Sequence, residues 1–215
     1  MLASEAQAQA LVDLFKTGTK LTYKKGEYVI RPGEPPRAVY YIEKGLVKAF
    51  NISKYGEENL LIIRKDQEIF PLIWSITGQE RHIIYQTLTP ATIYRLSQED
   101  FQKFMRGSKK ALAPILDMVT EMYRIHSERI LNLEYRTVRE RLVSFLLTMS
   151  RRFGKKTKEG ILIDVPLRHQ DIASSVNSSR ETANRELSKL ERRGLITSKQ
   201  GYITLVDKAK LRQFL

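Results

Sequence analysis

Residues 20–98 contain recurring short hydrophobic runs that are rich in β-branched and aromatic side chains. Turn-forming residues such as Pro32-Gly33 and Tyr55-Gly56 separate the runs. Several short strands at this spacing are typical of a β-sandwich or barrel. We therefore predict an N-terminal β domain over residues 1–107. Its strands are expected at Glu27–Ile30, Val39–Ile42, Val47–Ile52, Asn59–Ile63, Ile83–Leu88 and Thr92–Leu96.

From Ser108 onward the hydrophobic period changes from that of strands to that of a helix. Apolar positions recur at alternating steps of three and four, which is the heptad pattern of a coiled coil. We predict a dimerisation helix over residues 108–136, with Pro114 leaving its start open. The alternative is a helix that packs against its own β domain. The seam begins Leu112, Ile115, Val119 and Met122, and it becomes polar at His126 and Arg129 before Leu133.

The last third of the chain, residues 137–215, alternates helical and strand patterns. A helix over Thr137–Phe153 precedes a basic, turn-rich segment at 151–160 that we interpret as a loop, and a short strand follows at Ile161–Val165. A short amphipathic helix then carries Leu167, Ile172, Ala173 and Val176. It breaks at Asn177-Ser178, where Ser178 and Glu181 fit a capping box.

A second helix is predicted from Arg180 to Arg193, and Gly194 ends it. Strands at Leu195–Ser198 and Tyr202–Val206 around Gln200-Gly201 complete a winged helix-turn-helix. One face of the helix is apolar, with Ala183, Leu187 and Leu190. The opposite face suits a DNA major groove, because arginine donates two bonds to guanine and glutamate accepts from cytosine. It carries Arg180, Glu181, Asn184, Arg185 and Ser188.

The charge distribution agrees with a polyanionic partner, either nucleic acid or an anionic membrane, and the alternative is a soluble protein with a basic surface. The formal net charge is +13, and residues 137–215 hold 17 Lys and Arg against 8 Asp and Glu. The chain has no cysteine and three histidines, His82, His126 and His169, without a metal-binding spacing. We therefore expect no metal site and no enzyme. No segment is long and apolar enough to span a bilayer, and the N-terminus lacks the pattern of a secretion signal, so we expect a cytoplasmic protein.

The stretch Ser179-Arg180-Glu181-Thr182 through Arg185-Glu186-Leu187, with Leu190-Glu191 and Gly194-Leu195-Ile196, closely resembles the cyclic-AMP receptor protein/FNR (CRP/FNR) family of bacterial regulators. The glycine rhythm of the β domain and the long helix match as well. The resemblance implies an α+β fold made of an N-terminal β-roll of the cyclic-nucleotide-binding jelly-roll type, a dimerisation helix and a winged helix-turn-helix. It also implies a homodimer on duplex DNA with an inverted repeat of TGTGA-like half-sites, and RNA polymerase as a further partner.

By resemblance, Arg180, Glu181 and Arg185 match the residues that read base edges, and Asn184 is the position where this helix adds its own preference. The plainer interpretation makes Glu181 a capping residue and Arg180 a solvated charge, and both roles are compatible. Five further residues are expected to contact phosphate or the rim of the interface. These are Arg168, His169, Gln170, Ser179 and Lys199.

Members of this family sense different signals through the β-roll. This sequence mainly excludes some of those signals. Without cysteine it cannot build an FNR-type iron–sulfur cluster. The cyclic-nucleotide subfamily carries a Gly-Glu pair followed by Arg-Ser. When Gly78-Gln79-Glu80-Arg81 anchors the alignment, His82 replaces the serine and the Gly-Glu pair falls on Phe70-Pro71. Proline has no amide hydrogen and phenylalanine cannot bind a hydroxyl, so we do not expect cyclic AMP to bind.

The remaining candidate for an effector site is an apolar and aromatic stretch near the predicted seam. Such residues usually form a core, and the alternative is a pocket for an apolar or mixed effector. We do not expect haem at the isolated histidines. The candidate pocket residues are Phe70, Trp74, Arg81, His82, Tyr85, His126 and Ser127.

Three rival functions differ in what they require of the sequence. A cyclic-nucleotide-binding regulatory module would lack the helix-turn-helix and would keep the phosphate cassette. A β-roll enzyme of the cupin kind needs clustered histidine and carboxylate ligands. A DNA-binding regulator that has no ligand at all shares every feature named above, and it stays open beside the effector-controlled regulator.

Overall fold

The computed structural model describes residues 2–108 and 112–215, and the predicted start of the dimerisation helix at 109–111 lies outside them. Contacts divide the chain into two compact units. The first comprises Met1–Asn51 and Leu61–Tyr123, and the second comprises Ile52–Leu60 and Arg124–Leu215. The division therefore falls inside the long helix. It also assigns a short hairpin segment to the C-terminal unit.

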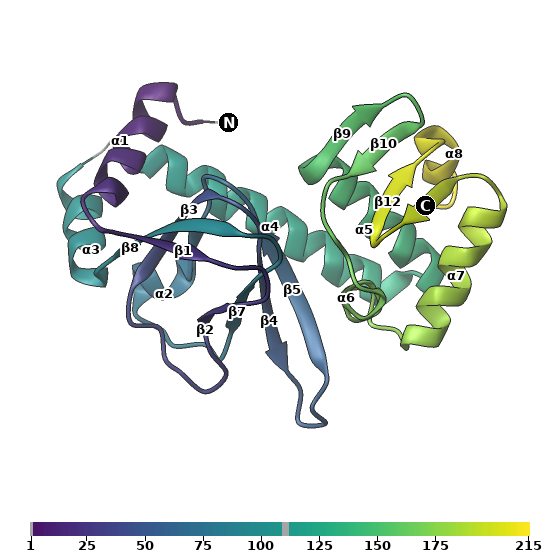
Figure 1. Ribbon diagram of the computed structural model, residues 1–215, viewed down its shortest axis with the longest axis horizontal. Coiled ribbons are helices and arrows are strands. Elements are labelled where there is room, and N and C mark those ends of the chain that lie inside the picture. Colours follow the sequence, from purple (N-terminus) through teal and green to yellow (C-terminus); the bar gives the residue numbers. More distant parts are fainter. Residues whose placement is uncertain (1, 109–111) are drawn as a thin grey trace. The chain divides into compact units, whose positions relative to one another are not determined.

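Two four-stranded antiparallel sheets form the β-roll (Figure 1). Tyr41 of β3 pairs with Tyr94 of β8, and Leu21 of β1 pairs with Ile93 on the other side of β8. One sheet has the order β1 (Thr19–Tyr23), β8 (Ala91–Leu96), β3 (Val39–Lys44), β6 (Ile69–Phe70). The other has the order β2 (Tyr28–Ile30), β7 (Ile84–Thr87), β4 (Val47–Ile52), β5 (Glu58–Arg64).

The six predicted strands are confirmed to within two residues at their ends. Strands β1 and β6 lie outside the predicted runs. The side chains of β1 are mostly exposed, and β6 has only two residues, so neither produces an apolar pattern that could be recognised.

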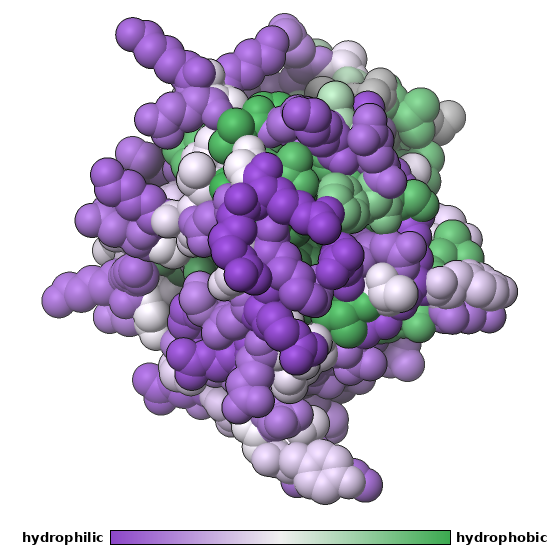
Figure 2. Space-filling model, turned by 90° about the vertical axis from the view of Figure 1, so that its right-hand side faces the viewer, coloured by the Kyte–Doolittle hydropathy of each residue, from purple (hydrophilic) through white to green (hydrophobic). Residues whose placement is uncertain are grey.

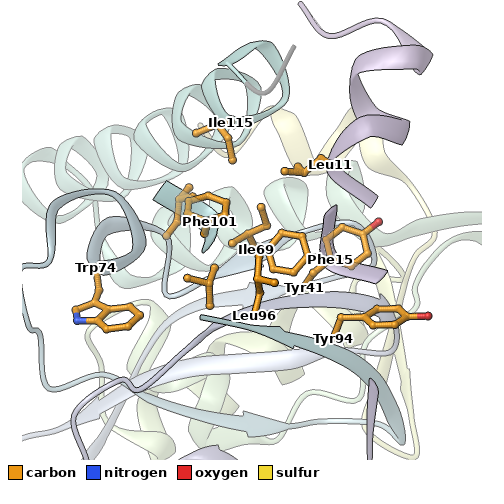
Figure 3. Packing of buried hydrophobic residues seen from close by; sticks show 11 residues of the cluster. Leu11, Phe15, Tyr41, Ile69, Trp74, Tyr94, Leu96, Phe101 and Ile115 are labelled. Carbon is orange, nitrogen blue, oxygen red and sulfur yellow. The ribbon is translucent and has the colours of Figure 1, made fainter. Parts of the chain in front are cut away.

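Three short helices of the first unit were not predicted from the sequence: α1 (Glu5–Lys16), α2 (Leu72–Thr77) and α3 (Gln98–Gly107). Ser4 and Gln7 form a capping box at the start of α1, and Ser97 caps α3. The helices bury their apolar faces against the sheet of β3 and β8. Figure 3 shows the resulting cluster, which includes Leu11, Phe15, Tyr41, Tyr94 and Phe101.

The long helix α4 (Leu112–Tyr135) has 24 residues and two different apolar faces. Ile115 is 5% exposed and belongs to the core cluster of the first unit (Figure 3). Met118, Val119 and Met122 pack partly against the same cluster. The chain's own β-roll therefore covers Ile115 almost completely and Val119 and Met122 partly, whereas Leu112 is exposed, and the predicted seam stays a prediction.

A neighbouring face of α4 remains exposed. Leu112 is 54%, Leu116 51%, Tyr123 72% and Ile130 63% exposed. Successive residues of a helix lie about 100° apart, so these four fall within about 40° of arc. Their steps of four and seven follow the same heptad period as the predicted seam, rotated by roughly one side chain.

The second unit is a small helical domain with one four-stranded sheet of order β11-β12-β10-β9. Thr137 caps its first helix in a capping box with Glu140, which separates that helix from α4. In chain order its elements are α5 (Val138–Phe153), β9 (Gly154–Thr157), β10 (Gly160–Ile163), α6 (His169–Ser175), α7 (Arg180–Arg192), β11 (Ile196–Lys199), β12 (Tyr202–Leu205) and α8 (Lys208–Arg212).

Two local predictions in this unit were wrong. The segment predicted as a loop at 151–160 contains strand β9, which pairs with β10. Gly154 permits the abrupt change from helix to strand, because a Cβ there would lie 2.1 Å from the carbonyl oxygen of Ser150. The cap of α7 is Ser179 and not Ser178, since the Ser179 side chain accepts from the Thr182 amide.

Candidate nucleic-acid interface

Helix α7 separates an apolar face from a polar one, as predicted. Ala183, Leu187 and Leu190 are buried, at 0%, 8% and 1% exposure. Arg180 and Arg185 are exposed. Figure 2 shows that the face of the molecule that carries α7 and α8 is mostly hydrophilic. The helix therefore binds its own unit through one face and presents cations and hydrogen-bonding groups on the other, with Glu181 and Ser188 also exposed and Asn184 partly so.

Asn184 differs from its exposed neighbours in one respect. Its Oδ1 atom is buried and has no hydrogen-bond partner among the described residues. A buried acceptor without a donor costs free energy.

The turn between α6 and α7 is held from α5 by Arg141, a residue that the sequence analysis did not single out. Its Nε donates to the carbonyl oxygen of Val176 at 2.7 Å, and its NH2 donates to that of Asn177 at 3.2 Å. Asn177 has a φ of 48°, in the left-handed region. Arg141 thus binds the carbonyl groups of the turn that sets the angle between the two helices.

Helix α7 is also tied to α5 by a buried carboxylate. Glu186 is 7% exposed and accepts from Arg139 Nε at 2.7 Å and from Lys189 Nζ at 2.7 Å. Burial raises the pKa of Glu186, but the bonds from Lys189 and Arg139 outweigh it and leave the pKa below its ordinary value. The only sequence signal for this pair is a carboxylate on the otherwise apolar face of α7.

Arg168 departs from the expectation of a free phosphate contact. Its guanidinium donates to Asp171, with Nε–Oδ2 at 3.0 Å and NH2–Oδ1 at 2.8 Å, and to Glu58 Oε2 at 2.6 Å. The hydrogen bond to Asp171 is the main reason that the pKa of Arg168 lies above its ordinary range. Two carboxylates already neutralise this arginine. His169 and Gln170 beside it are exposed in the first turn of α6.

The wing and the β9–β10 hairpin add exposed cations. Lys199 is exposed at the end of β11, beside a turn in which Gln200 and Gly201 both have positive φ. All four residues of β9 are exposed. Lys155 pairs with Asp164 there, while Lys156 on the same strand forms no ion pair within the described residues.

The residues of the predicted effector site lie in different surroundings. Phe70 stacks between Tyr40, at 5.3 Å, and Tyr85, at 4.6 Å between ring centroids, so Phe70 and Tyr85 are core residues. Trp74 is 9% exposed. Arg81 and His82 are exposed on the segment between α2 and β7, and His126 and Ser127 are partly exposed on α4.

Two buried cations in the β-roll have no counterpart in the sequence analysis. Lys48 is 2% exposed and lies over the Phe50 ring, and Arg64 is 4% exposed. Arg64 donates to Glu68 at 3.3 Å and contacts Met122 Sδ at 3.3 Å. Its Nε atom is buried without a partner in the described part of the chain. Burial raises the pKa of Tyr85, and Arg64 and Arg81 counteract that effect.

Neither a metal centre nor a membrane segment is found in the described parts of the chain. Across residues 2–108 and 112–215, no group of three or more metal-ligating side chains comes together. No helix in these ranges has the length and hydropathy needed to cross a bilayer.

Comparison with known proteins assigns both parts of the chain. Residues 20–108 match the cyclic nucleotide-binding domain, and residues 140–214 match the Crp-like helix-turn-helix domain. The chain therefore belongs to the CRP/FNR family, and it is a DNA-binding transcription regulator of that type.

Individual relatives agree with this assignment. The Global nitrogen regulator of Synechococcus elongatus is 32% identical, with 89% of this chain and 87% of that protein covered. The Global nitrogen regulator of a Nostoc species is 31% identical, with 90% and 88% covered. The structure of FixK2 from Bradyrhizobium japonicum has a TM-score of 0.78 at 21% identity, with 92% of this chain and 96% of that chain covered, which establishes the shared fold.

Proposed function

We propose that the protein acts as a homodimer that reads an inverted repeat, with α7 of each protomer in the major groove. The observation that carries the proposal is the exposed face of α7, where Arg180, Glu181 and Arg185 stand together above a buried apolar face. Two-fold symmetry would present the two helices about 34 Å apart, one turn of the duplex. By resemblance the half-sites are related to TGTGA.

The proposed dimer seam is the exposed stripe of α4 and not the buried one. Leu112, Leu116, Tyr123 and Ile130 supply apolar side chains at heptad spacing on a helix of 24 residues. Exposed apolar side chains in a continuous row favour burial against a partner. A second copy of the same helix is the partner whose pattern fits, because its stripe has the same spacing.

We propose that a small effector other than cyclic AMP controls the protein. Phe70 occupies a position where the nucleotide subfamily grips its ligand, and here its ring lies in an aromatic stack. The buried Nε of Arg64 has no partner among the described residues and is a hydrogen-bond donor that an effector could use. The second candidate is a regulator without any ligand, which the filled core around Phe70 favours. We also propose that the protein acts in the cytoplasm, with RNA polymerase as a further partner.

The DNA-binding part of the proposal is tested by titrating labelled duplexes with wild-type protein and with Arg180→Ala. One duplex carries the inverted repeat and the other a scrambled sequence. A good bidentate contact contributes about 1–3 kcal/mol of discrimination, so loss from two half-sites should weaken specific binding by roughly 30-fold or more. Binding to the scrambled duplex should hardly change.

Lys156→Ala is the matched control, because it removes an exposed cation of the same unit outside α7. It should weaken binding to both duplexes equally and reduce the salt dependence. Equal losses on both duplexes for Arg180→Ala would show that α7 does not read the sequence.

A further inference from the structure

The segment Ile52–Leu60, which we call the hairpin tip, connects β4 to β5 and clusters with the second unit. The rest of both strands belongs to the β-roll sheet. Polar contacts to α4 and α6 hold the hairpin tip within the second unit. The hairpin tip is therefore continuous in the chain with β4 and β5, and its hydrogen bonds to α4 and α6 lie within the second unit.

Arg129 of α4 is the central residue of these contacts. Its NH1 donates to the carbonyl oxygen of Leu60 at 2.7 Å, and its NH2 donates to Asn59 Oδ1 at 3.0 Å. The same NH2 donates to the carbonyl oxygen of Ser174, in α6, at 3.1 Å. All three acceptors are neutral, and burial lowers the pKa of Arg129. The hydrogen bonds from Arg129 are therefore directional, and those to Leu60 and Asn59 form only when the hairpin tip is in this position.

Ser174 adds a second connection between the hairpin tip and α6. The backbone amide of Leu60 donates to Ser174 Oγ at 3.2 Å. Leu60 thus uses both its amide and its carbonyl group, one on α6 and one on Arg129. Both backbone groups of Leu60 are therefore hydrogen-bonded, as they would be inside a β-sheet.

Glu58 of the hairpin tip reaches the arginine that precedes α6. Its Oε2 accepts from Arg168 NH2 at 2.6 Å, and Arg168 also donates to Asp171. The Arg168 side chain is 56% exposed and that of Asp171 is 4% exposed. Asp171 therefore binds the guanidinium on its buried side, and Glu58 binds it on its solvent-exposed side.

We propose that the hairpin tip is an autoinhibitory latch, in which Glu58 occupies the edge of Arg168 that a DNA phosphate would otherwise bind. Arg129 and Ser174 keep the tip in place. Opening the latch releases one cation per protomer to the duplex while Asp171 keeps that cation oriented. This inference rests on the proposed function, because the competing phosphate is present only when DNA is bound.

The physical basis is competition between two anions for one guanidinium. With Glu58 and Asp171 both beside Arg168, the local charge is negative and repels a phosphate. Without the Glu58 charge the local sum is zero, and the exposed edge of Arg168 can donate to the backbone. Glu57 is exposed on the same hairpin tip and provides a matched charge that does not hydrogen-bond to Arg168.

The test compares Glu58→Gln with Glu57→Gln in the full-length protein. Affinity for the inverted-repeat duplex and for a scrambled duplex is measured at several salt concentrations. Each additional phosphate that the protein neutralises steepens the plot of log affinity against log salt by about 0.9, so Glu58→Gln should add up to about twice that in a dimer. Glu57→Gln should leave the slope unchanged, and equal slopes for both variants would overturn the latch.

The role of Arg168 is isolated by repeating Glu58→Gln in an Arg168→Gln background, where its effect should shrink to that of Glu57→Gln. An undiminished effect there contradicts the proposal. Hydrogen exchange at the Leu60 amide gives a readout that needs no variant, and exchange should speed up when the duplex binds. Unchanged protection at saturating DNA would also overturn the latch. A wild-type protein with no preference for the inverted repeat contradicts the proposed function instead, while the slope comparison on scrambled duplex still decides the latch.

Discussion

The two apolar faces of α4 share one heptad period, yet one is covered by the chain's own β-roll and the other is exposed. Ile115 and Met122 face the chain's own β-roll, and Tyr123 and Ile130 face solvent. A heptad pattern identifies apolar side chains, but it does not identify the surface that covers them. Because the two adjoining apolar stripes share one period, they merge into one broad pattern along the sequence.

The largest expected effect comes from charging the exposed face. Tyr123→Glu combined with Ile130→Glu puts four carboxylates into a two-fold seam. The dissociation constant of the dimer should therefore rise by about 100-fold or more. Sedimentation should then detect monomers with an unchanged circular dichroism spectrum. Thr120→Glu is the control, because Thr120 is exposed about 80° around the same helix from Leu112. A double variant that still sediments as the wild-type dimer would place the interface elsewhere.

A smaller effect of a different kind is expected on the buried face. Ile115→Ala should leave a cavity in the cluster of Phe101 and Ile69 and lower the free energy of unfolding by about 3 kcal/mol. Denaturant titration measures this loss at fixed protein concentration, and sedimentation should still find the wild-type association state. If Ile115→Ala weakened association and spared unfolding, the two faces would have been assigned the wrong way round.

The smallest expected effect is that of cyclic AMP. In this chain Phe70-Pro71 fills the position of the Gly-Glu pair with which the nucleotide subfamily binds its ligand. Calorimetry should therefore detect no specific heat of binding, with duplex DNA as the positive control on the same protein. Micromolar affinity accompanied by stronger DNA binding would show that the aromatic stack around Phe70 can open.

Much of the second unit followed from its sequence because its signals are local. The period of α7, the glycine after it and the turn at Gln200-Gly201 each depend on neighbours in the chain. The six main strands of the β-roll were predicted for the same reason. Helix α1 and strand β9 were missed. The capping box of Ser4 and Gln7 is a local signal that would have identified α1, whereas the strand pairing of β9 overrides a basic, turn-rich composition.

The sequence by itself determined the class of protein, the polar face of α7 that carries Arg180 and Arg185, and the exclusion of cysteine-based chemistry. Only the tertiary structure decided which stripe of α4 is covered, that Arg168 meets two carboxylates, and that Arg129 holds the hairpin tip. The physical reason is the range of the interactions. Helical period and turn geometry arise between residues a few positions apart, whereas burial and ion pairing depend on which distant segment the fold brings within about 3 Å.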